Sequence, residues 1–242
     1  MRSRIIYILC HNDETERLAN SEFSKYSWAR IYRIPKESQN YLMESVMYQS
    51  ELMKLYDEWK ECDYVGTLSY KLPARLMYPP FSTMEKISNL VNTSDGDVVS
   101  FRTYESSHAD TLPNFRKILT DTCVRVGIKV NTLPKYNVLS RKVEYKNALD
   151  TMPCIFHNYW MTTPRLMLAY IKFFNYTWLP ALDSHPNVWD DSQYPYNLPK
   201  DELKLRMLEL TRGRAAHYPF HAIISEVIPT HFFRNIGASI TF

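Results

Sequence analysis

Short segments rich in apolar residues recur along the chain and are separated by longer segments with a different pattern. They lie at residues 4–10, 28–34, 63–70, 97–101 and 154–160, and the first is a continuous apolar run from Ile5 to Cys10. An apolar run without polar alternation, rich in β-branched and aromatic residues, is typical of a strand that is covered on both faces. The pattern therefore predicts a sheet with buried central strands.

The segments between these runs carry apolar residues at helical spacing. In the longest one, Leu42, Val46, Met53 and Tyr56 share a face, and the segment contains neither Gly nor Pro. A first helix is expected to begin in the polar cluster from His11 to Glu16. Further helices are predicted at residues 40–60, 82–92, 111–127, 164–174 and 199–212.

Local signals support the ends of several predicted helices. Ser82 and Glu85 have the spacing of a capping box, and Pro164 suits a first helical turn. Gly127 and Gly213 are expected to close their helices. Residues 222–233 form the last predicted segment of regular structure, which Pro229 is expected to interrupt.

Strands that alternate with helices predict an α/β fold, with a mostly parallel sheet and helices on both faces. The length of 242 residues fits one domain, 1–242, with a mixed C-terminal part. The chain has only five Gly and lacks both the GxGxxG and the Walker pattern. The usual dinucleotide-binding and P-loop classes are thereby excluded.

The composition points to a mildly basic, aromatic-rich protein. The net charge is +3, and Lys and Arg are scattered, so we expect no nucleic-acid partner. A modest positive field suits an anionic ligand such as a nucleoside diphosphate. Aromatic residues make up 14% of the chain, which fits either a carbohydrate-binding surface or a large aromatic core.

The cysteines and the N-terminal run indicate a cytoplasmic location. Cys10, Cys62, Cys123 and Cys154 form no CxxC pair, so we expect reduced and mostly buried thiols. The first apolar run is too short for a signal peptide, and no window approaches the ~18 apolar residues of a membrane span.

Ligands of open α/β sheets bind at the carboxyl ends of the strands. The candidate segments are therefore Cys10–Asp13, Ser69–Lys71, Phe101–Tyr104 and Asn158–Met161. We expect Leu9, Ser69 and Trp160 to lie at the same edge of the sheet and to line the ligand site.

Four motif-bearing segments follow one another along the chain: Ile6–Asn12 (IYILCHN), Tyr41–Tyr48 leading through Tyr56–Lys60 (YDEWK) into Asp63–Tyr70 (DYVGTLSY), Phe156–Met161 (FHNYWM) before the helix 164–174, and His217–Glu226 (HYPFHAIISE). In this order they resemble a glycosyltransferase group found in bacterial polysaccharide gene clusters and in large algal DNA viruses. Each motif alone is weak, and the resemblance extends over nearly the whole chain. The group often has Arg where Val227 stands here.

The resemblance implies a GT-A-like, Rossmann-like fold and a nucleoside-diphosphate sugar as donor. Residues 1–130 would form the nucleotide-sugar-binding half and residues 131–242 the acceptor-side half. The implied location is the cytoplasm, or the host cytoplasm for a viral protein. Within the donor-binding half and the C-terminal motif, the expected nucleotide-sugar contacts are Cys10, His11, Asn12, Asp13, Thr67, Ser69, Tyr70, Lys71, Arg214, His217 and His221.

Folds of this type usually hold Mn²⁺ or Mg²⁺ with an Asp-x-Asp motif just after a central strand. The chain has a literal Asp-x-Asp at Asp95-Gly96-Asp97, but it precedes its strand. We expect it to be a surface turn at the edge of the sheet opposite to the ligand. Either the metal is held differently, or Lys71, Arg214, His217 or His221 neutralises the diphosphate.

The acceptor side needs a base, because a sugar hydroxyl is a poor nucleophile. Glu226 lies in an apolar run, and Asp190 and Asp191 follow Trp189. These carboxylates are the catalytic candidates; the alternatives are an ion pair of Glu226 with Arg214 and a solvated loop at 190–191. Acceptor or sugar contacts are expected from Glu44, Asn158, Trp160 and Trp189, although Trp160 is equally consistent with the core and Glu44 with a favourable helix-dipole position.

These expectations combine into one function and one rival. The function is transfer of a hexose or deoxyhexose from a nucleoside-diphosphate sugar to a hydroxyl of a glycan acceptor. The rival is a non-catalytic nucleotide- or carbohydrate-binding α/β module within a larger polysaccharide-synthesis protein. Release of nucleoside diphosphate from a donor discriminates between the two.

Overall fold

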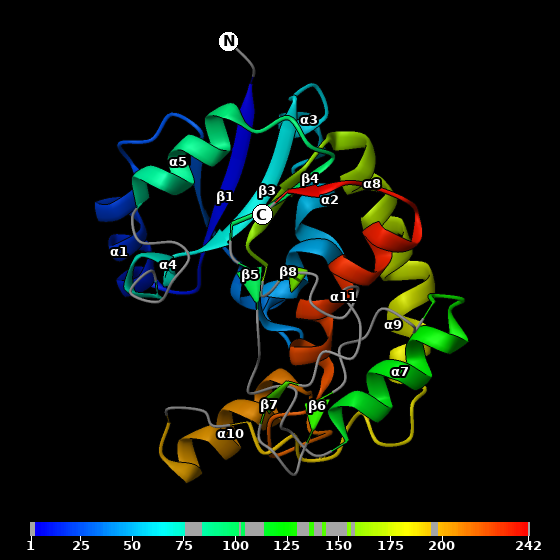
Figure 1. Cartoon of the computed structure of the whole chain (residues 1–242). Coiled ribbons are helices and arrows are strands. Elements are labelled where there is room, and N and C mark those ends of the chain that lie inside the picture. Colours follow the sequence, from blue (N-terminus) through cyan, green and yellow to red (C-terminus); the bar gives the residue numbers. More distant parts are fainter. Residues whose placement is uncertain are drawn as a thin grey trace.

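A six-stranded mixed sheet forms the centre of the protein, as seen in a computed structural model (Figure 1). The structure describes residues 3–75, 84–101, 103–104, 114–129, 136–137, 142–143, 154–155, 158–194 and 198–241. The strand order is β10-β4-β9-β3-β1-β2. The strands are β1 (Arg4–Cys10), β2 (Ala29–Arg33), β3 (Tyr64–Ser69), β4 (Val98–Ser100), β9 (Trp160–Thr162) and β10 (Ile240–Thr241).

Strand β9 is the one that runs against its neighbours in the described sheet. It pairs antiparallel with both β3 and β4, whereas β1 pairs parallel with β2 and β3, and β4 pairs parallel with β10. The sheet is therefore mostly parallel, as predicted. Two small antiparallel pairs lie apart from it: β5 (Thr103–Tyr104) with β8 (Cys154–Ile155), and β6 (Tyr136–Asn137) with β7 (Lys142–Val143).

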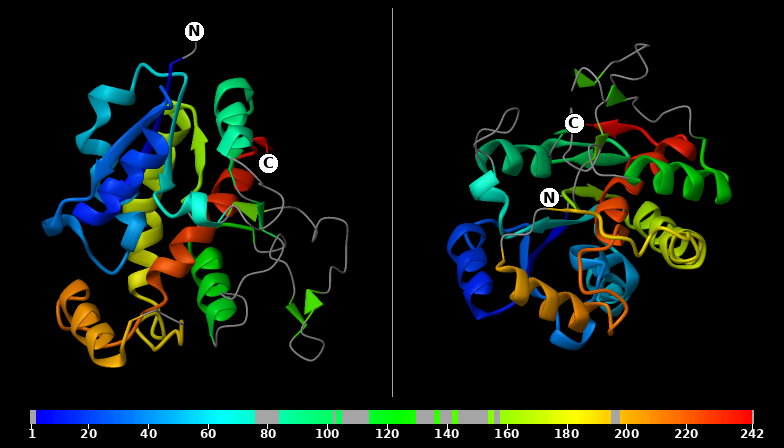
Figure 2. Two further views of the ribbon diagram at one scale, coloured as in Figure 1. Left: turned by 90° about the vertical axis from the view of Figure 1, so that its left-hand side faces the viewer. Right: turned by 90° about the horizontal axis from the view of Figure 1, so that it is seen from below.

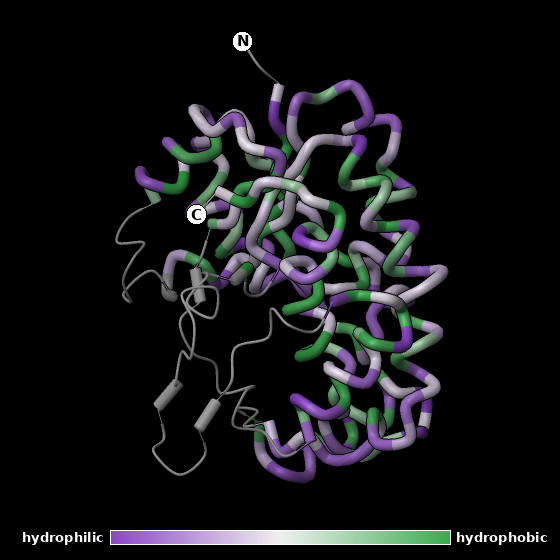
Figure 3. The backbone as a smooth tube through the Cα atoms, turned by 45° about the vertical axis from the view of Figure 1, so that its right-hand side comes forward, coloured by the Kyte–Doolittle hydropathy of each residue, from purple (hydrophilic) through white to green (hydrophobic). Residues whose placement is uncertain are grey.

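Strand β1 is buried on both faces because its apolar run does not alternate with polar residues. In β1, Ile6 and Ile8 pack into one core cluster, while Tyr7 and Leu9 pack into the other. Both faces of the sheet are covered by helices, as predicted. In the hydropathy view the hydrophilic segments lie mostly at the outer turns (Figure 3).

The first core cluster lies under α1 (Asp13–Phe23) and α5 (Met84–Thr93). Asn12 caps α1 by accepting from the backbone N–H of Thr15, in a capping box. The short helix α4 (Leu72–Arg75) follows β3 on the same side of the sheet. Ser82, the cap predicted for the next helix, lies outside the described residues.

The larger core cluster lies on the other face of the sheet (Figure 1). It is covered by residues 43–59 and 115–125 together with segments from the second half of the chain, and it holds many of the aromatic side chains. The elements are η2 (Met43–Ser45), η3 (Met47–Glu51), α2 (Leu52–Lys54), α3 (Tyr56–Trp59), α7 (Phe115–Arg125), α8 (Pro164–Phe173), η6 (Phe174–Trp178), α9 (Leu179–Asp183) and α11 (His221–Asn235).

Helix α10 (Lys200–Leu210) sits at the end of the molecule toward which β1 and β3 run (Figure 2). Only Met207 and Leu210 of this helix are buried. Gly213 follows it with a φ of 81°, which a residue without Cβ adopts at little cost. A short 3-10 turn, η1 (Lys36–Ser38), follows β2.

Three sequence predictions of secondary structure are wrong in detail. The helix expected at residues 40–60 is broken into 3-10, π and α turns. The strand expected at 154–160 is two short strands that belong to different sheets. Pro229 lies within α11 and does not interrupt it. Within the described residues, no helix is both long and apolar enough to cross a membrane.

Candidate functional site

The carboxyl ends of β1 and β3 meet at one edge of the sheet, called the carboxyl edge below. Leu9 pairs with Ser69, and Trp160 pairs with Thr67 across the reversed strand. Leu9, Ser69 and Trp160 therefore lie at the same edge, as predicted. The reason differs from the one expected for Trp160, because this residue begins its strand and does not end it.

A group of titratable side chains gathers at the carboxyl edge: His11, Glu44, Lys71 and Arg206, called the edge group. His11 Nε2 lies 4.0 Å from Glu44 Oε1, and their side chains are 29% and 15% exposed. Tyr70 joins them, with its ring edge-to-face with His11 and under the ammonium group of Lys71. Burial lowers the pKa of His11; Glu44 opposes this change, while Lys71 and Arg206 add to it. The ring is therefore neutral at pH 7.

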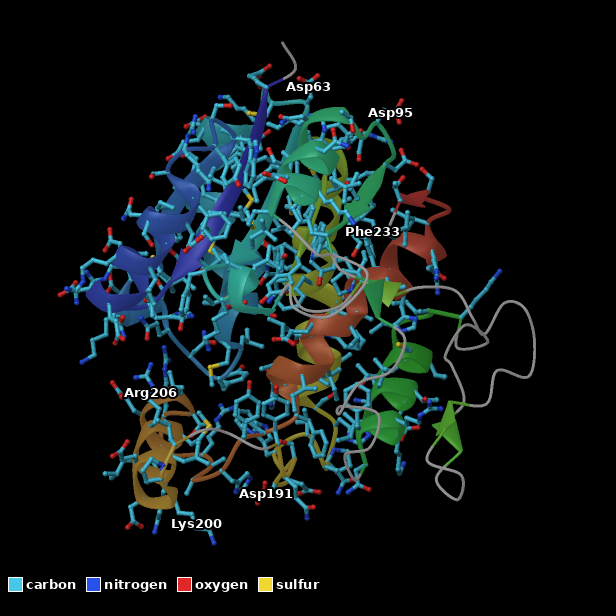
Figure 4. The ribbon with its side chains drawn as sticks, turned by 60° about the vertical axis from the view of Figure 1, so that its left-hand side comes forward. Asp63, Asp95, Asp191, Lys200, Arg206 and Phe233 are labelled. Carbon is cyan, nitrogen blue, oxygen red and sulfur yellow. The ribbon has the colours of Figure 1, made fainter. Side chains whose placement is uncertain are left out.

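Arg206 reaches this group from α10 and is not among the residues that the sequence predicts for the site. Its guanidinium donates to Gln39 Oε1 at 2.8 Å and to Glu209 Oε2 at 3.0 Å. Gln39 in turn donates to the backbone oxygens of His11 and Ile34. A side chain 167 positions away in sequence thus anchors Arg206, and no local pattern in 199–212 signals that contact. Arg206 lies at the end of the molecule opposite to Asp63 and Asp95 (Figure 4).

A chain of buried polar groups lies beside the edge group. The Tyr48 hydroxyl is 2.8 Å from Thr67 Oγ1, which donates to the Asn158 backbone oxygen at 2.6 Å. Asn158 Nδ2 donates to Ser45 Oγ at 3.3 Å. Burial raises the pKa of Tyr48 far above its usual range, and the negative charges of Glu44 and Glu226 raise it further.

Glu226 is therefore close to this chain of polar groups, although it comes from the other half of the sequence. It is half-buried on α11, and α11 packs against η2, which carries Glu44. The structure brings together His11, Lys71, Tyr70, Glu44 and Glu226, each of which was a candidate in the sequence.

Other predicted contacts lie in the core and do not face a ligand. Trp160 is fully buried and stacks on Tyr48 with ring centroids 5.3 Å apart, so it is a core residue and not a sugar platform. The side chains of Asn158, Thr67 and Ser69 are also buried. Their hydrogen bonds hold the edge in place from within.

The residues after β1 also have structural partners. Cys10 is fully buried, its thiol donates to the Tyr32 backbone oxygen, and burial raises its pKa to about 11. Asn12 caps α1, and Asp13 is an exposed ion-pair partner of Arg33. Of the segment Cys10–Asp13, His11 alone has its side chain in the edge group.

A second group, called the aromatic group, forms where α11 begins. The rings of Tyr41 and Trp189 lie against the ring of His221, at centroid distances of 4.6 and 4.2 Å. Asp183 Oδ1 is 2.9 Å from His221 Nε2. Arg214 lies over the Trp189 ring at 5.0 Å.

His217 belongs to the neighbourhood of this group, with Nε2 2.7 Å from the Trp189 backbone oxygen. Asp190 and Asp191 have local roles in the same loop. Asp190 accepts from the side chain of Asn187, and Asp191 accepts from the backbone N–H of Gln193. Both carboxylates are exposed, as the solvated-loop alternative expects.

The motif Asp95-Gly96-Asp97 lies in an exposed bend at the start of β4. Val98 is level with Val65 across β9, so the bend is at the edge where β3 begins. The position agrees with the prediction. Asp97 Oδ2 accepts from both the N–H and the hydroxyl of Ser239, which ties the bend to β10 and lowers the pKa of Asp97.

The side chains that could hold a divalent cation are dispersed among the described residues. No three His, Cys, Asp or Glu side chains in that part of the chain converge closely enough to hold a metal ion. His11 and Glu44 are two neighbouring side chains, and the Asp-x-Asp motif is at the opposite edge. The described residues therefore do not fit the metal site that the resemblance implies.

Comparisons with known proteins assign no family to the chain. No protein-family model matches the sequence, and neither a curated protein nor a solved structure matches it significantly.

Proposed function

We propose that the chain is a glycosyltransferase that moves a hexose or deoxyhexose from a nucleoside-diphosphate sugar to a glycan hydroxyl. The observation that carries this proposal is the edge group, in which Glu44 lies 4.0 Å from His11 and the positive charges of Lys71 and Arg206 act on the same His11 ring. It lies at the carboxyl ends of parallel strands, where α/β sheets bind their ligands. The ordered motifs of the sequence support the same function.

The diphosphate of the donor is proposed to bind between Lys71 and Arg206. Their positive charges would stabilise the negative charge that develops on the diphosphate oxygen as it leaves. Arg206 has a guanidinium able to hold two phosphate oxygens at once, after exchanging its present partners Gln39 and Glu209. The neutral His11 ring would donate one hydrogen bond to the nucleotide.

Glu226 is proposed to be the proton acceptor. In a single displacement the acceptor oxygen bonds to the anomeric carbon while the bond from that carbon to the diphosphate breaks. The electron pair leaves with the diphosphate, and the proton of the acceptor hydroxyl passes to Glu226. A positioned base contributes typically ~10²–10⁴-fold to such a step. Glu226 is favoured over Asp190 and Asp191 because those two are held in an exposed turn.

Release of nucleoside diphosphate tests the proposal. Sugar conjugates of UDP, GDP and dTDP are incubated with the protein and a mixture of oligosaccharides, with and without Mn²⁺. Lys71→Ala and Arg206→Ala should each lower turnover at least tenfold and weaken nucleotide binding. Glu226→Gln should lower turnover while nucleotide affinity stays within a few-fold.

Matched controls are available for both cations. Lys204→Ala removes an exposed charge from the same helix as Arg206, and Lys60→Ala removes one from an exposed ion pair with Asp57. Both should turn over normally. Nucleotide binding that depends on Lys71 and Arg206, without turnover of any donor, would favour the non-catalytic binding module.

A further inference from the structure

Two buried histidines of this chain are each paired with an aspartate, and the pairs differ in one respect. His185 is 3% exposed, with Nε2 3.4 Å from Asp121 Oδ2. Its Nδ1 accepts from the backbone N–H of Asn187 at 3.2 Å. Both ring nitrogens of His185 are thus engaged within the protein, as expected of a histidine with a purely structural role.

His221 has the same kind of partner but keeps one nitrogen open. Its Nε2 is 2.9 Å from Asp183 Oδ1 and its side chain is fully buried. Its Nδ1 is buried and finds no hydrogen-bond partner in the part of the chain that the structure describes. A buried polar atom without a partner destabilises the protein, so a ligand that supplies the missing hydrogen bond would remove that penalty.

The tautomer of His221 follows from its partner. A carboxylate accepts hydrogen bonds and does not donate them, so the Nε2 proton points at Asp183. The lone pair is then on Nδ1. Burial lowers the pKa of His221; Asp183 opposes this change and Arg214 adds to it. The group missing at Nδ1 is therefore a hydrogen-bond donor, such as a hydroxyl.

The surroundings of His221 narrow the chemistry of that donor. Tyr41 and Trp189 flank the ring and are themselves half-buried, so their outer edges reach solvent. Asp183 is 38% exposed. Aromatic faces beside a hydrogen-bond acceptor suit a sugar ring, which offers C–H faces and hydroxyls together. Helix α11, which begins with His221, also packs against η2, the segment that carries Glu44 of the edge group.

We propose that His221 and Asp183 form a sugar-recognition site, in which Nδ1 accepts a hydrogen bond from a hydroxyl of a sugar packed on Tyr41 and Trp189. The choice of a sugar as ligand rests on the proposed function, whereas the open nitrogen does not. Because Nδ1 is buried, this site requires the half-buried Trp189 ring to turn outward and admit the ligand hydroxyl. The sugar belongs either to a free glycan or to the nucleotide-sugar donor.

The substitution Asp183→Asn tests the site without removing the histidine. It keeps the size of the side chain and removes the charge that fixes the proton on Nε2. When the NH2 group of the new amide faces Nε2, the ring proton moves to Nδ1 and the acceptor becomes a donor, and the ¹⁵N spectrum reports which nitrogen carries the proton. Asp121→Asn is the matched control, since it changes the other Asp–His pair in the same way. Trp189→Leu is a second variant that leaves the pair intact and removes one aromatic wall.

The measurement is the ¹⁵N spectrum of the histidine rings during titration with methyl glucoside, galactoside, mannoside and rhamnoside, and separately with their nucleotide conjugates. At least one glycoside should shift Nδ1 of His221. Asp183→Asn and Trp189→Leu should weaken its binding at least tenfold, and Asp121→Asn less than twofold. A shift by the conjugates and not by free glycosides would assign the site to the donor sugar.

Two results would overturn the proposal. One is a His221 signal that responds to none of these sugars in the folded wild-type protein. The other is equal loss of sugar binding in Asp183→Asn and Asp121→Asn. Binding of UDP and GDP is measured in the same samples to distinguish failure of the sugar site from failure of the proposed glycosyltransferase function. Sugar binding without any nucleotide binding would refute the glycosyltransferase function and support the sugar site.

Discussion

Replacement of Asp97 by Asn separates a structural role of the Asp-x-Asp motif from a catalytic one. One oxygen of Asp97 accepts two hydrogen bonds, each 2.9 Å long, from the N–H and the hydroxyl of Ser239. Hydrogen bonds to a charged group contribute about 1.5–3 kcal/mol when sheltered, and exposed interactions far less. Because Asp97 is exposed, we expect a loss of about 1 kcal/mol in the free energy of unfolding.

Urea unfolding at pH 7 measures this change, and Asp95→Asn is the control. Asp95 lies two residues away in the same exposed bend and should change stability by less than about 0.5 kcal/mol. Since the bend is at the edge of the sheet away from the edge group, neither variant nor the double variant should alter turnover more than about twofold. A hundredfold loss of turnover in a folded double variant would refute the placement of the ligand at the carboxyl edge.

Three further predictions concern the core beneath the site. Burial lowers the pKa of His231 to about 4, so this histidine is protonated in the unfolded state at a higher pH (~6.5) than in the folded state. The free energy of unfolding of the wild type should therefore fall by about 2 kcal/mol between pH 7 and pH 5. In urea unfolding at both pH values, His231→Phe should lack this part of the decrease. Gly66→Ala should destabilise the protein by about 3 kcal/mol, because a Cβ there would collide with the backbone oxygen of Trp160. An unchanged midpoint of thermal unfolding would contradict the close approach of β3 and β9. Tyr48→Phe removes one buried hydrogen bond to Thr67 and should cost about 1 kcal/mol, measured by calorimetry against Tyr176→Phe, whose side chain is exposed.

Much of the sheet was predictable because its central strands are marked locally. The segments that became β1 and β3 are rich in β-branched, aromatic and other apolar residues, and each predicted segment matches the observed strand within about one residue. The contacts that break the helix expected at 40–60 are not local. Asn175 donates to the backbone oxygens of Tyr48 and Ile171, joining the π turns η3 and η6 across 127 positions of sequence. The helical spacing of apolar residues at 40–60 does not indicate that Asn175 contacts this segment.

The residues of the candidate site were likewise predictable only where a local pattern marks them. His11 and Lys71 follow buried strands, so the general topology of α/β sheets is enough to make them candidates. Trp160 has the side chain of a sugar platform, and only its stacking on Tyr48 in the core shows otherwise. Asp183 could not be named, because its pairing with His221 brings together residues 38 positions apart.

The strand β10 is another element that depends on distant residues. Its two residues pair with β4 and are preceded by Ser239, which binds Asp97 across 142 positions of sequence. A segment of this length carries no periodicity of its own. Its structure follows from the edge that β4 presents, and not from its own sequence.

Binding of nucleoside diphosphates tests the central claim most directly. UDP, GDP, dTDP and ADP are titrated calorimetrically into wild type, Lys71→Ala, Arg206→Ala and the control Lys204→Ala, with and without Mn²⁺. The proposed site predicts that at least one nucleotide binds wild type and Lys204→Ala alike, and that each of the other two variants binds it at least tenfold more weakly. Absence of binding by all four nucleotides, or equal binding by all four proteins, would contradict the claim that the edge group holds a diphosphate.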